Sequence, residues 1–284
     1  MRTIRNLHEM RAYSRQARRA GSTLGFVPTM GALHEGHLSL VRQSVARCNV
    51  TVASIFINPA QFGENEDLAV YPVDLENDRD LLKRAGADVL FLPTAADIYP
   101  PGFKTHVTVS DVTARLCGKS RPMFFRGVIT VVLKLLNIVE PDTAFFGEKD
   151  RQQLEVVKTM VRDLNLDVAI ASGPIVREAD GLAMSSRNRY LSEADRVSAL
   201  CLSRALSAAS QRVRAGEVTA ENLRREMLGI IQKEGRAEVD YISVCDPRSF
   251  EEKETIGDEA LIALAVKIGG TRLIDNCIVG GKKK

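Results

Sequence analysis

Short apolar segments alternate with longer amphipathic ones through the first half of the chain. Four of the apolar segments are rich in valine, isoleucine and phenylalanine: Leu24–Pro28, Val50–Ile57, Asp88–Pro93 and Thr143–Phe146. Strands of a parallel sheet have this apolar composition when helices cover both faces of the sheet, because neither face is in contact with water. Helical patterns separate these segments, and residues 129–139 are apolar enough for a buried helix. The first half is therefore predicted to be α/β, a Rossmann-like doubly wound parallel sheet.

The pattern changes near residues 172–174. Residues 197–213 and 220–233 have helical periodicity, and the segments VDYISVCD, ALIALAVKI and TRLIDNCIV that follow are typical of strands. We therefore predict two domains, a Rossmann-like domain over residues 1–173 and a smaller C-terminal α+β domain over residues 174–284. Residues 1–21 are predicted to form a charged amphipathic helix rather than a signal peptide.

Composition restricts the class of protein further. The chain has 284 residues, of which 45% are hydrophobic and 26% charged, as in an ordinary globular enzyme. A net charge of +3 gives no reason to expect a nucleic-acid or membrane partner. No segment approaches the roughly 18 apolar residues that a membrane span requires. Five widely spaced cysteines without a CxxC motif suit a reducing compartment, so we expect a cytoplasmic protein.

The first predicted strand ends at a proline, and two glycines and two histidines follow it, in the run VPTMGALHEGH. In an open α/β sheet, ligands bind beyond the carboxyl ends of the strands, where helix N-termini offer unpaired N–H groups. Gly31 and Gly36 allow a ligand to approach the backbone. His34 and His37 lie three residues apart at a helix start, so both can donate to one phosphate chain. The run predicts a phosphate-binding site.

Other interpretations of this run remain open. A histidine at a helix start is often only a polar cap, and two histidines at this spacing could ligate zinc if a third ligand were found. The run is neither a dinucleotide GxGxxG motif nor a P-loop. Taken whole, Pro-Thr-Met-Gly-x-x-His-x-Gly-His resembles the signature of the HxGH nucleotidyltransferases. Members of that superfamily, which includes class I aminoacyl-tRNA synthetases, transfer a nucleotidyl group and release pyrophosphate.

A second motif lies about 150 residues downstream, in DGLAMSSRNRYLS. Members of the superfamily often carry a Met-Ser-Lys/Arg-like loop that closes on the triphosphate. Serines and an arginine in a polar loop are commonplace, so this segment alone indicates little. Its position after the HxGH run supports nucleotidyl transfer.

Three further segments narrow the family: SIFINPAQFGENEDLAVYP, FFGEKDRQQL and GPIVREADGLAMSSRNRYL. Together with VPTMGALHEGH and TRLIDN, they closely resemble the pantoate–β-alanine ligase family over nearly the whole chain. The resemblance implies that ATP converts pantoate to an enzyme-bound pantoyl adenylate with release of pyrophosphate. β-Alanine then displaces AMP to give pantothenate, a step of coenzyme A biosynthesis. It also implies a cytoplasmic homodimer whose smaller C-terminal domain acts as a lid.

The resemblance also assigns residues to the reaction. It makes His37 the proton donor and places His34, Lys149 and Arg187 beside it in catalysis. It assigns ATP binding to Met30, Gly31, Ala32, Leu33, His34, Glu35, Gly36, His37, Gly147, Glu148, Lys149, Asp150, Val176, Met184, Ser185, Ser186 and Arg187. In isolation, Gly147–Asp150 would be read as a helix-capping turn with a solvated charge pair.

Pantoate and β-alanine need ligands of their own. The resemblance assigns pantoate to Gln61 and Gln153, and β-alanine in part to Gln61. Neutral amides can orient the carboxylate and hydroxyls of pantoate through donors and acceptors without weakening the nucleophile. Arg121, with Arg126 as the alternative, is our candidate for the β-alanine carboxylate. Family members commonly read Arg-Pro-x-His-Phe here, but this chain has Phe124, so no catalytic role for a histidine carries over.

ATP chemistry implies Mg²⁺, mostly as a bridge between phosphates. We assign no metal ligand to the acidic run Asp74–Asp80. Acidic residues at a helix start usually complement the helix dipole and stay solvated. Two rival functions remain. One is a nucleotidyltransferase that retains the nucleotide in its product, and the other is a nucleotide-binding sensor without chemistry. A tRNA synthetase is disfavoured because the chain lacks a strongly basic face.

Overall fold

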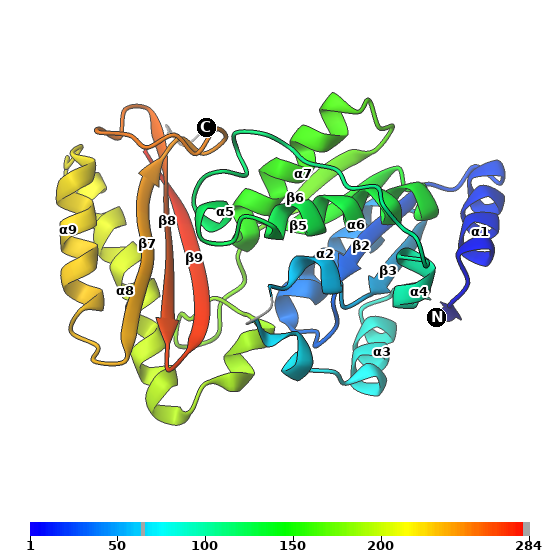
Figure 1. Ribbon diagram of the computed structural model, residues 1–284, viewed down its shortest axis with the longest axis horizontal. Coiled ribbons are helices and arrows are strands. Elements are labelled where there is room, and N and C mark those ends of the chain that lie inside the picture. The colour runs from blue at the N-terminus through cyan, green and yellow to red at the C-terminus, as the bar shows by residue number, and fades with distance from the viewer. Residues whose placement is uncertain (64–65, 281–284) are drawn as a thin grey trace. The chain divides into compact units, whose positions relative to one another are not determined.

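The computed structural model describes residues 1–63 and 66–280, and the chain divides into two compact units (Figure 1). The first unit contains residues 1–110, 121–148 and 153–175, within the described ranges. The second contains residues 111–120, 149–152 and the chain from residue 176 onward. The boundary predicted between residues 173 and 174 lies close to residues 175 and 176, where the chain enters the second unit for the last time. The sequence pattern gave no sign that two short earlier segments belong with the C-terminal part.

The first unit is built on a parallel sheet of six strands, in the order β1-β4-β3-β2-β5-β6. The strands are β1 (Arg2–Ile4), β2 (Leu24–Thr29), β3 (Val50–Ile55), β4 (Val89–Phe91), β5 (Thr143–Gly147) and β6 (Ala169–Gly173). Consecutive residues of a strand point to opposite faces, yet Phe26 and Val27 are both fully buried. Both faces of the sheet are therefore covered, and the prediction of a Rossmann-like α/β fold is confirmed.

Helices cover this sheet. They are α1 (Leu7–Arg19), α2 (Glu35–Arg47), α3 (Leu75–Arg84), the short α4 (Ala95–Ile98), α6 (Phe124–Val139) and α7 (Arg151–Asp163), whose first two residues belong to the second unit. Val41 of α2 and Leu82 of α3 share an apolar cluster with Val27 of β2. Helices α1 and α6 also contact β2. The predicted buried helix is confirmed, because Ile129, Leu135 and Val139 of α6 are buried.

The two edge strands were not predicted. Residues 2–4 form β1, paired in parallel with β4, whereas the sequence predicted a helix from residue 1. The prediction was wrong there because Ile4 is buried against the sheet, and Asn6 starts α1 only afterwards by capping its first amides. Strand β6 escaped notice because its residues are small and mostly half-exposed.

The second unit contains an antiparallel sheet in the order β7-β8-β9, labelled in Figure 1 beside α8 and α9. Its elements are α5 (Cys117–Ser120), α8 (Glu193–Arg214), α9 (Ala220–Ile231), β7 (Ala237–Cys245), β8 (Glu259–Ile268) and β9 (Thr271–Gly280). Leu202 and Leu206 of α8 and Met227 of α9 form one buried cluster with Ile262 and Val266 of β8. The predicted α+β arrangement of the C-terminal part is confirmed.

Strand order determines where a ligand site can form in the first unit. Strand β2 lies between β3 and β5, and all three run parallel. The segments that follow them therefore leave the same edge of the sheet. Strands β3 and β4 lie on one side of β2, and β5 and β6 lie on the other, so the strand order has its switch point between β2 and β5. Within the described residues, no helix combines the length and apolar character needed to cross a membrane.

Candidate active site

The two histidines of the HxGH run form the N-terminus of α2. His34 is the N-cap residue, and its Nδ1 accepts the backbone N–H of Gly36 at 3.2 Å. The Nδ1 of His37 in turn accepts the backbone N–H of His34 at 3.4 Å, and the two rings lie 4.1 Å apart between centroids. A neutral imidazole that accepts at Nδ1 carries its proton on Nε2. Both histidines are thus donors at Nε2, as phosphate binding requires.

Glycine at position 36 has a steric cause. A Cβ there would lie 2.9 Å from Cε1 of His34, closer than non-bonded carbon atoms approach one another, and 3.0 Å from its Nδ1. The His34 ring can fold over the start of α2 only because residue 36 lacks that atom. The His-x-Gly-His spacing is therefore a geometric unit in which Gly36 makes room for the first histidine.

A buried carboxylate that no sequence motif marks holds the loop between β2 and α2. Asp78 is 1% exposed and accepts the backbone amides of Ala32 at 2.8 Å and Leu33 at 2.7 Å. The loop needs such support, since Gly31 and Ala32 both have positive φ, of 87° and 49°. The interpretation of the Asp74–Asp80 run as a solvated face was wrong at Asp78.

Gln61 also reaches this loop. It ends a single 3₁₀ turn, η1 (Pro59–Gln61), and its Nε2 lies 2.9 Å from Sδ of Met30. Its Oε1 accepts from Nδ2 of Asn58, which is 1% exposed. Tyr99 donates to Oδ1 of Asn58 at 2.7 Å, and burial raises the pKa of Tyr99 to about 12. Gln61 is thus held beside Met30 by an internal hydrogen-bond chain.

The segment after β5 carries the next group of predicted residues. Gly147 ends the strand, and no described atom beyond its neighbours lies within 4 Å of the place a Cβ would take. Glycine is therefore not required there by internal packing, which leaves room for close approach from outside. Glu148 accepts from Oγ of Ser172 at 2.9 Å. Gln153 lies half-buried in the first turns of α7.

Lys149 and Asp150 belong to the second unit. The Lys149 ammonium lies 3.9 Å from the Asp150 carboxylate, and its side chain is 19% exposed. The backbone carbonyl of Lys149 accepts a hydrogen bond from Nδ2 of Asn276 at 2.9 Å. Gln152, which no sequence motif marks either, is buried and donates to the carbonyls of Val112 and Arg115. That side chain explains why residues 111–120 join this unit.

A hairpin in the second unit carries the second motif. The carbonyl of Val176 accepts the backbone N–H of Met184 at 3.0 Å, so these two predicted ATP ligands adjoin. Ser185 then caps a 3₁₀ turn, η4 (Ser186–Tyr190), by accepting the N–H of Arg187 at 3.3 Å. Asn188 anchors the same turn through donation to Glu178 at 2.7 Å and to the carbonyl of Ala183 at 3.1 Å.

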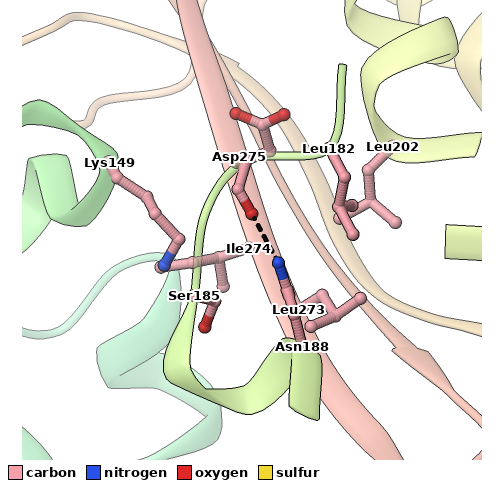
Figure 2. Close-up of a pocket in the computed structure, with 9 residues that line it drawn as sticks. Lys149, Leu182, Ser185, Asn188, Leu202, Leu273, Ile274 and Asp275 are labelled. Carbon is pink, nitrogen blue, oxygen red and sulfur yellow. Dashed lines mark hydrogen bonds between the residues drawn. The ribbon is translucent and has the colours of Figure 1, made fainter. Parts of the chain in front are cut away.

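Figure 2 shows a small pocket of the second unit in which these segments meet. The Lys149 side chain extends toward the loop that carries Ser185, while Asn188 lies on the other side of that loop's turn. Nine residues line the pocket: Lys149, Leu182, Ala183, Ser185, Asn188, Leu202, Leu273, Ile274 and Asp275. A cation and a hydroxyl from separate parts of the chain thus face one space.

Arg121 has an internal partner. Its guanidinium forms a two-point ion pair with Glu66, with Nε 2.6 Å from Oε1, and its Nη2 also donates to the carbonyl of Gln61 at 3.2 Å. The same guanidinium lies 3.8 Å from the ring centroid of Phe124. Phe124 therefore provides a stacking surface where a histidine was expected. Any external carboxylate that binds Arg121 must compete with Glu66.

The described residues do not form a metal centre. Among them, no three or more His, Cys, Asp or Glu side chains are grouped so as to hold a metal ion. The zinc interpretation of His34 and His37 therefore gains no third ligand from this part of the chain.

The predicted residues form two sets. The first unit places Gln61 beside Met30, in the loop that leads to the histidine pair, and ends the neighbouring strand β5 at Gly147. The second brings together Lys149, Ser185 and the Val176–Met184 pair. Donors at a helix N-terminus beside the switch point of a parallel sheet are the arrangement that binds nucleotide phosphates. Fold and site together define a nucleotide-binding protein of the Rossmann-like α/β class.

Comparison with known proteins narrows this class to one family. Residues 2–278 match the family described as Pantoate-beta-alanine ligase. Pantothenate synthetases of Geobacter sulfurreducens and Heliobacterium modesticaldum are each 54% identical to the chain, covering 99% and 98% of it and 99% of each relative. The chain belongs to the pantoate–β-alanine ligase family.

Solved structures agree. A crystal structure of pantothenate synthetase from Thermus thermophilus superposes with a TM-score of 0.92 at 43% identity, covering 98% of this chain and 99% of that one. Pantoate-beta-alanine ligase from Francisella tularensis, complexed with beta-gamma ATP and beta-alanine, superposes with a TM-score of 0.82 at 34% identity, covering 98% and 97%. The fold of both units is thus found in proteins of this family.

Proposed function

We propose that the protein condenses (R)-pantoate with β-alanine at the expense of ATP, giving pantothenate, AMP and pyrophosphate. In the first step a carboxylate oxygen of pantoate attacks the α-phosphorus of ATP. The bond from that phosphorus to the bridging oxygen of the β-phosphate breaks, and pyrophosphate leaves. In the second step the amine of β-alanine attacks the acyl carbon of pantoyl adenylate, loses a proton and displaces AMP.

The first step needs donors aimed at growing negative charge. As charge develops on the phosphate oxygens, preorganised donors stabilise the transition state more than the ground state. We assign this role to Nε2 of His34 and His37, whose Nδ1 atoms are fixed by backbone N–H groups. Lys149 and Arg187 carry the positive charge that the departing pyrophosphate requires.

The remaining ATP contacts are assigned by their place in the chain. Met30–His37 and Gly147–Glu148 follow adjacent strands of the first unit, where a nucleoside can approach the backbone. Asp150 is proposed to accept a ribose hydroxyl, and Val176 to bind ATP through its backbone. Met184–Arg187 supply further phosphate contacts from the capped turn.

Pantoate binding is assigned to Gln61 and Gln153. The position of Gln61 supports this role, because Asn58 and Met30 fix its amide at the edge where β3 ends. An amide orients the substrate carboxylate but leaves its charge available for attack, whereas an arginine would neutralise it. β-Alanine is assigned to Gln61 and Arg121.

Mg²⁺ accompanies ATP and neutralises part of its phosphate charge. The C-terminal domain is proposed to act as a lid that keeps water from the acyl adenylate, which would otherwise hydrolyse. We also propose that the protein is a homodimer and is located in the cytoplasm.

The observation that carries this proposal is the histidine pair with both Nδ1 atoms engaged at the start of α2. The test is pantoate-dependent exchange between ATP and pyrophosphate, with β-alanine left out. We expect exchange in the unaltered protein, a loss of at least about a hundredfold in His37→Ala, and no loss in His8→Ala, an exposed residue of α1. Exchange without pantoate, or ATP binding without exchange, would favour the nucleotidyltransferase or the sensor instead.

A further inference from the structure

Two consecutive residues of β9 hold the two segments of the second unit that carry proposed phosphate ligands. Asp275 accepts Nη1 and Nη2 of Arg177, at 2.6 and 3.0 Å. Asn276 donates its Nδ2 to the carbonyl of Lys149 at 2.9 Å. Successive side chains of a strand point to opposite faces, so one strand can bind a different segment on each side.

The Asp275 contact fixes the hairpin that leads to Ser185. Arg177 also donates to the carbonyl of Gly181 at 3.1 Å and pairs with Ala183 in an antiparallel bridge. Its guanidinium therefore joins both sides of the hairpin to the strand. The Asp275 side chain is 2% exposed and also accepts the backbone N–H of Asn276 at 2.8 Å.

The Asn276 contact fixes the start of the Lys149 segment. Asn276 is 7% exposed, and a buried amide donor is costly to leave unmatched, so the bond to Lys149 restricts where that backbone can lie. Lys149, Ser185 and Asp275 line the same pocket, as Figure 2 shows. The distance between the Lys149 ammonium and the Ser185 turn thus depends on two adjacent residues of β9.

We infer that Asp275 and Asn276 are positioning residues that set the spacing between Lys149 and the Met184–Arg187 turn for the departing pyrophosphate. This inference rests on the proposed function. It has a specific consequence, because pyrophosphate leaves only in the first step. The pair acts on adenylate formation and leaves amide formation from pantoyl adenylate unaffected.

The test compares the two half-reactions in full-length variants. Asn276→Asp keeps the size of the side chain but removes its donor, and Asn276→Ala removes both. Ile278→Ala is the matched control, since it truncates a 43% exposed side chain two residues further along the same face. Pantoate-dependent exchange reports the first step, and pantothenate formed from supplied pantoyl adenylate and β-alanine reports the second.

We expect kcat for exchange to fall roughly threefold to tenfold in both Asn276 variants, the effect of losing one ordinary hydrogen bond. The KM for pantoate and the rate of the second step stay unchanged, and Ile278→Ala behaves like the unaltered protein. Equal losses in both half-reactions would show a merely structural role and overturn the inference, as would unchanged exchange.

A second variant tests the contact between Asp275 and Arg177. Arg177→Lys keeps the charge beside Asp275 but loses the two-point geometry, so the protein should fold while the hairpin loosens. We expect the same selective loss of exchange. Absence of pantoate-dependent exchange in the unaltered protein would refute the proposed function itself, and that outcome is distinct from a variant without effect.

Discussion

The buried carboxylate of Asp78 accepts the backbone amide of Leu33 at 2.7 Å, across 45 positions of sequence. The same group accepts the amide of Ala32, so one side chain of α3 fixes the loop that leads into the histidine pair. Both loop amides are donors, and only a carboxylate can accept from both without offering a donor of its own.

Replacing Asp78 by asparagine should therefore disturb the loop at one amide. We expect Asp78→Asn to lower the free energy of unfolding by about 1–3 kcal/mol, the cost of an unmatched buried donor, and to raise the KM for ATP. Asp80→Asn changes an exposed residue of the same helix and should do neither. Urea unfolding and exchange kinetics check both effects. If Asp78→Asn left the KM for ATP unaltered, the loop would not depend on this carboxylate.

Gly36 should be intolerant of a single added methyl group for a reason that concerns catalysis rather than stability. In Gly36→Ala the new Cβ displaces the His34 ring, so we expect exchange to fall by about tenfold or more while the helix itself gains propensity. Gly229→Ala in α9 is the control, because no described atom apart from its chain neighbours and the adjacent backbone of its own helix lies within 4 Å of its added Cβ. That variant should keep full exchange and unfold no more easily. Measured exchange at the unaltered level in Gly36→Ala would show that His34 need not lie over residue 36.

The sequence predicted the four inner strands of the parallel sheet and the helix start at the histidine pair because both depend on local signals. Val50–Ile57 and Thr143–Phe146 are continuous apolar runs, and the HxGH spacing is explained by a contact between neighbours, His34 and Gly36. The covered sheet and the place of the site at its edge follow from such patterns.

Other features depend on partners far apart in the chain. Asp78 looks like any acidic residue at a helix start, and only the fold shows that it faces the Ala32–Leu33 amides. Arg121 was interpreted as a ligand for a substrate carboxylate without its partner Glu66, which lies 55 residues earlier. A side chain's partners over such separations leave no periodic trace in a single sequence.

Tyr99 should make the protein sensitive to alkali. Burial raises the pKa of its hydroxyl from the ordinary value of 10 to about 12, so the folded state retains a proton that the unfolded state loses. This contribution to stability is complete below pH 10 and is lost as the pH rises from 10 through 12. We expect Tyr99→Phe to show a smaller fall in the free energy of unfolding between about pH 9 and about pH 11.5. Urea denaturation at both pH values measures it, and equal slopes for the two proteins would contradict the assignment.

Tyr99→Phe should also weaken the binding of pantoate. Without the hydroxyl, Asn58 loses a donor to its Oδ1 and holds Gln61 less firmly. We expect the KM for pantoate to rise about threefold to tenfold at about pH 8, with the KM for ATP unchanged. Tyr13→Phe is the matched control, since Tyr13 is a half-buried tyrosine of α1. An equal change in the control would assign the effect to general loosening.

Glu66 offers a test of β-alanine binding by Arg121. If the substrate carboxylate must displace Glu66, Glu66→Gln should lower the KM for β-alanine, since an amide competes less well for a guanidinium. Arg121→Ala should raise the same KM about tenfold or more, and Arg126→Ala should leave it unchanged. Initial rates at saturating ATP and pantoate measure all three. A rise in Arg126→Ala alone would transfer the assignment to that residue.

Phe124 should tolerate histidine only while the imidazole is neutral. The ring supports the Arg121 guanidinium at 3.8 Å, and a neutral imidazole provides a similar surface. A protonated imidazole would repel that guanidinium, and an unperturbed histidine has a pKa of about 6.5. We expect Phe124→His to keep kcat within about threefold at about pH 8 and to lose activity more steeply than the unaltered protein toward about pH 6. Profiles of kcat against pH for both proteins measure this. Parallel profiles would separate Phe124 from Arg121, whereas a gain of about a hundredfold at about pH 8 would show that phenylalanine had weakened an enzyme in which histidine acts on the reaction itself.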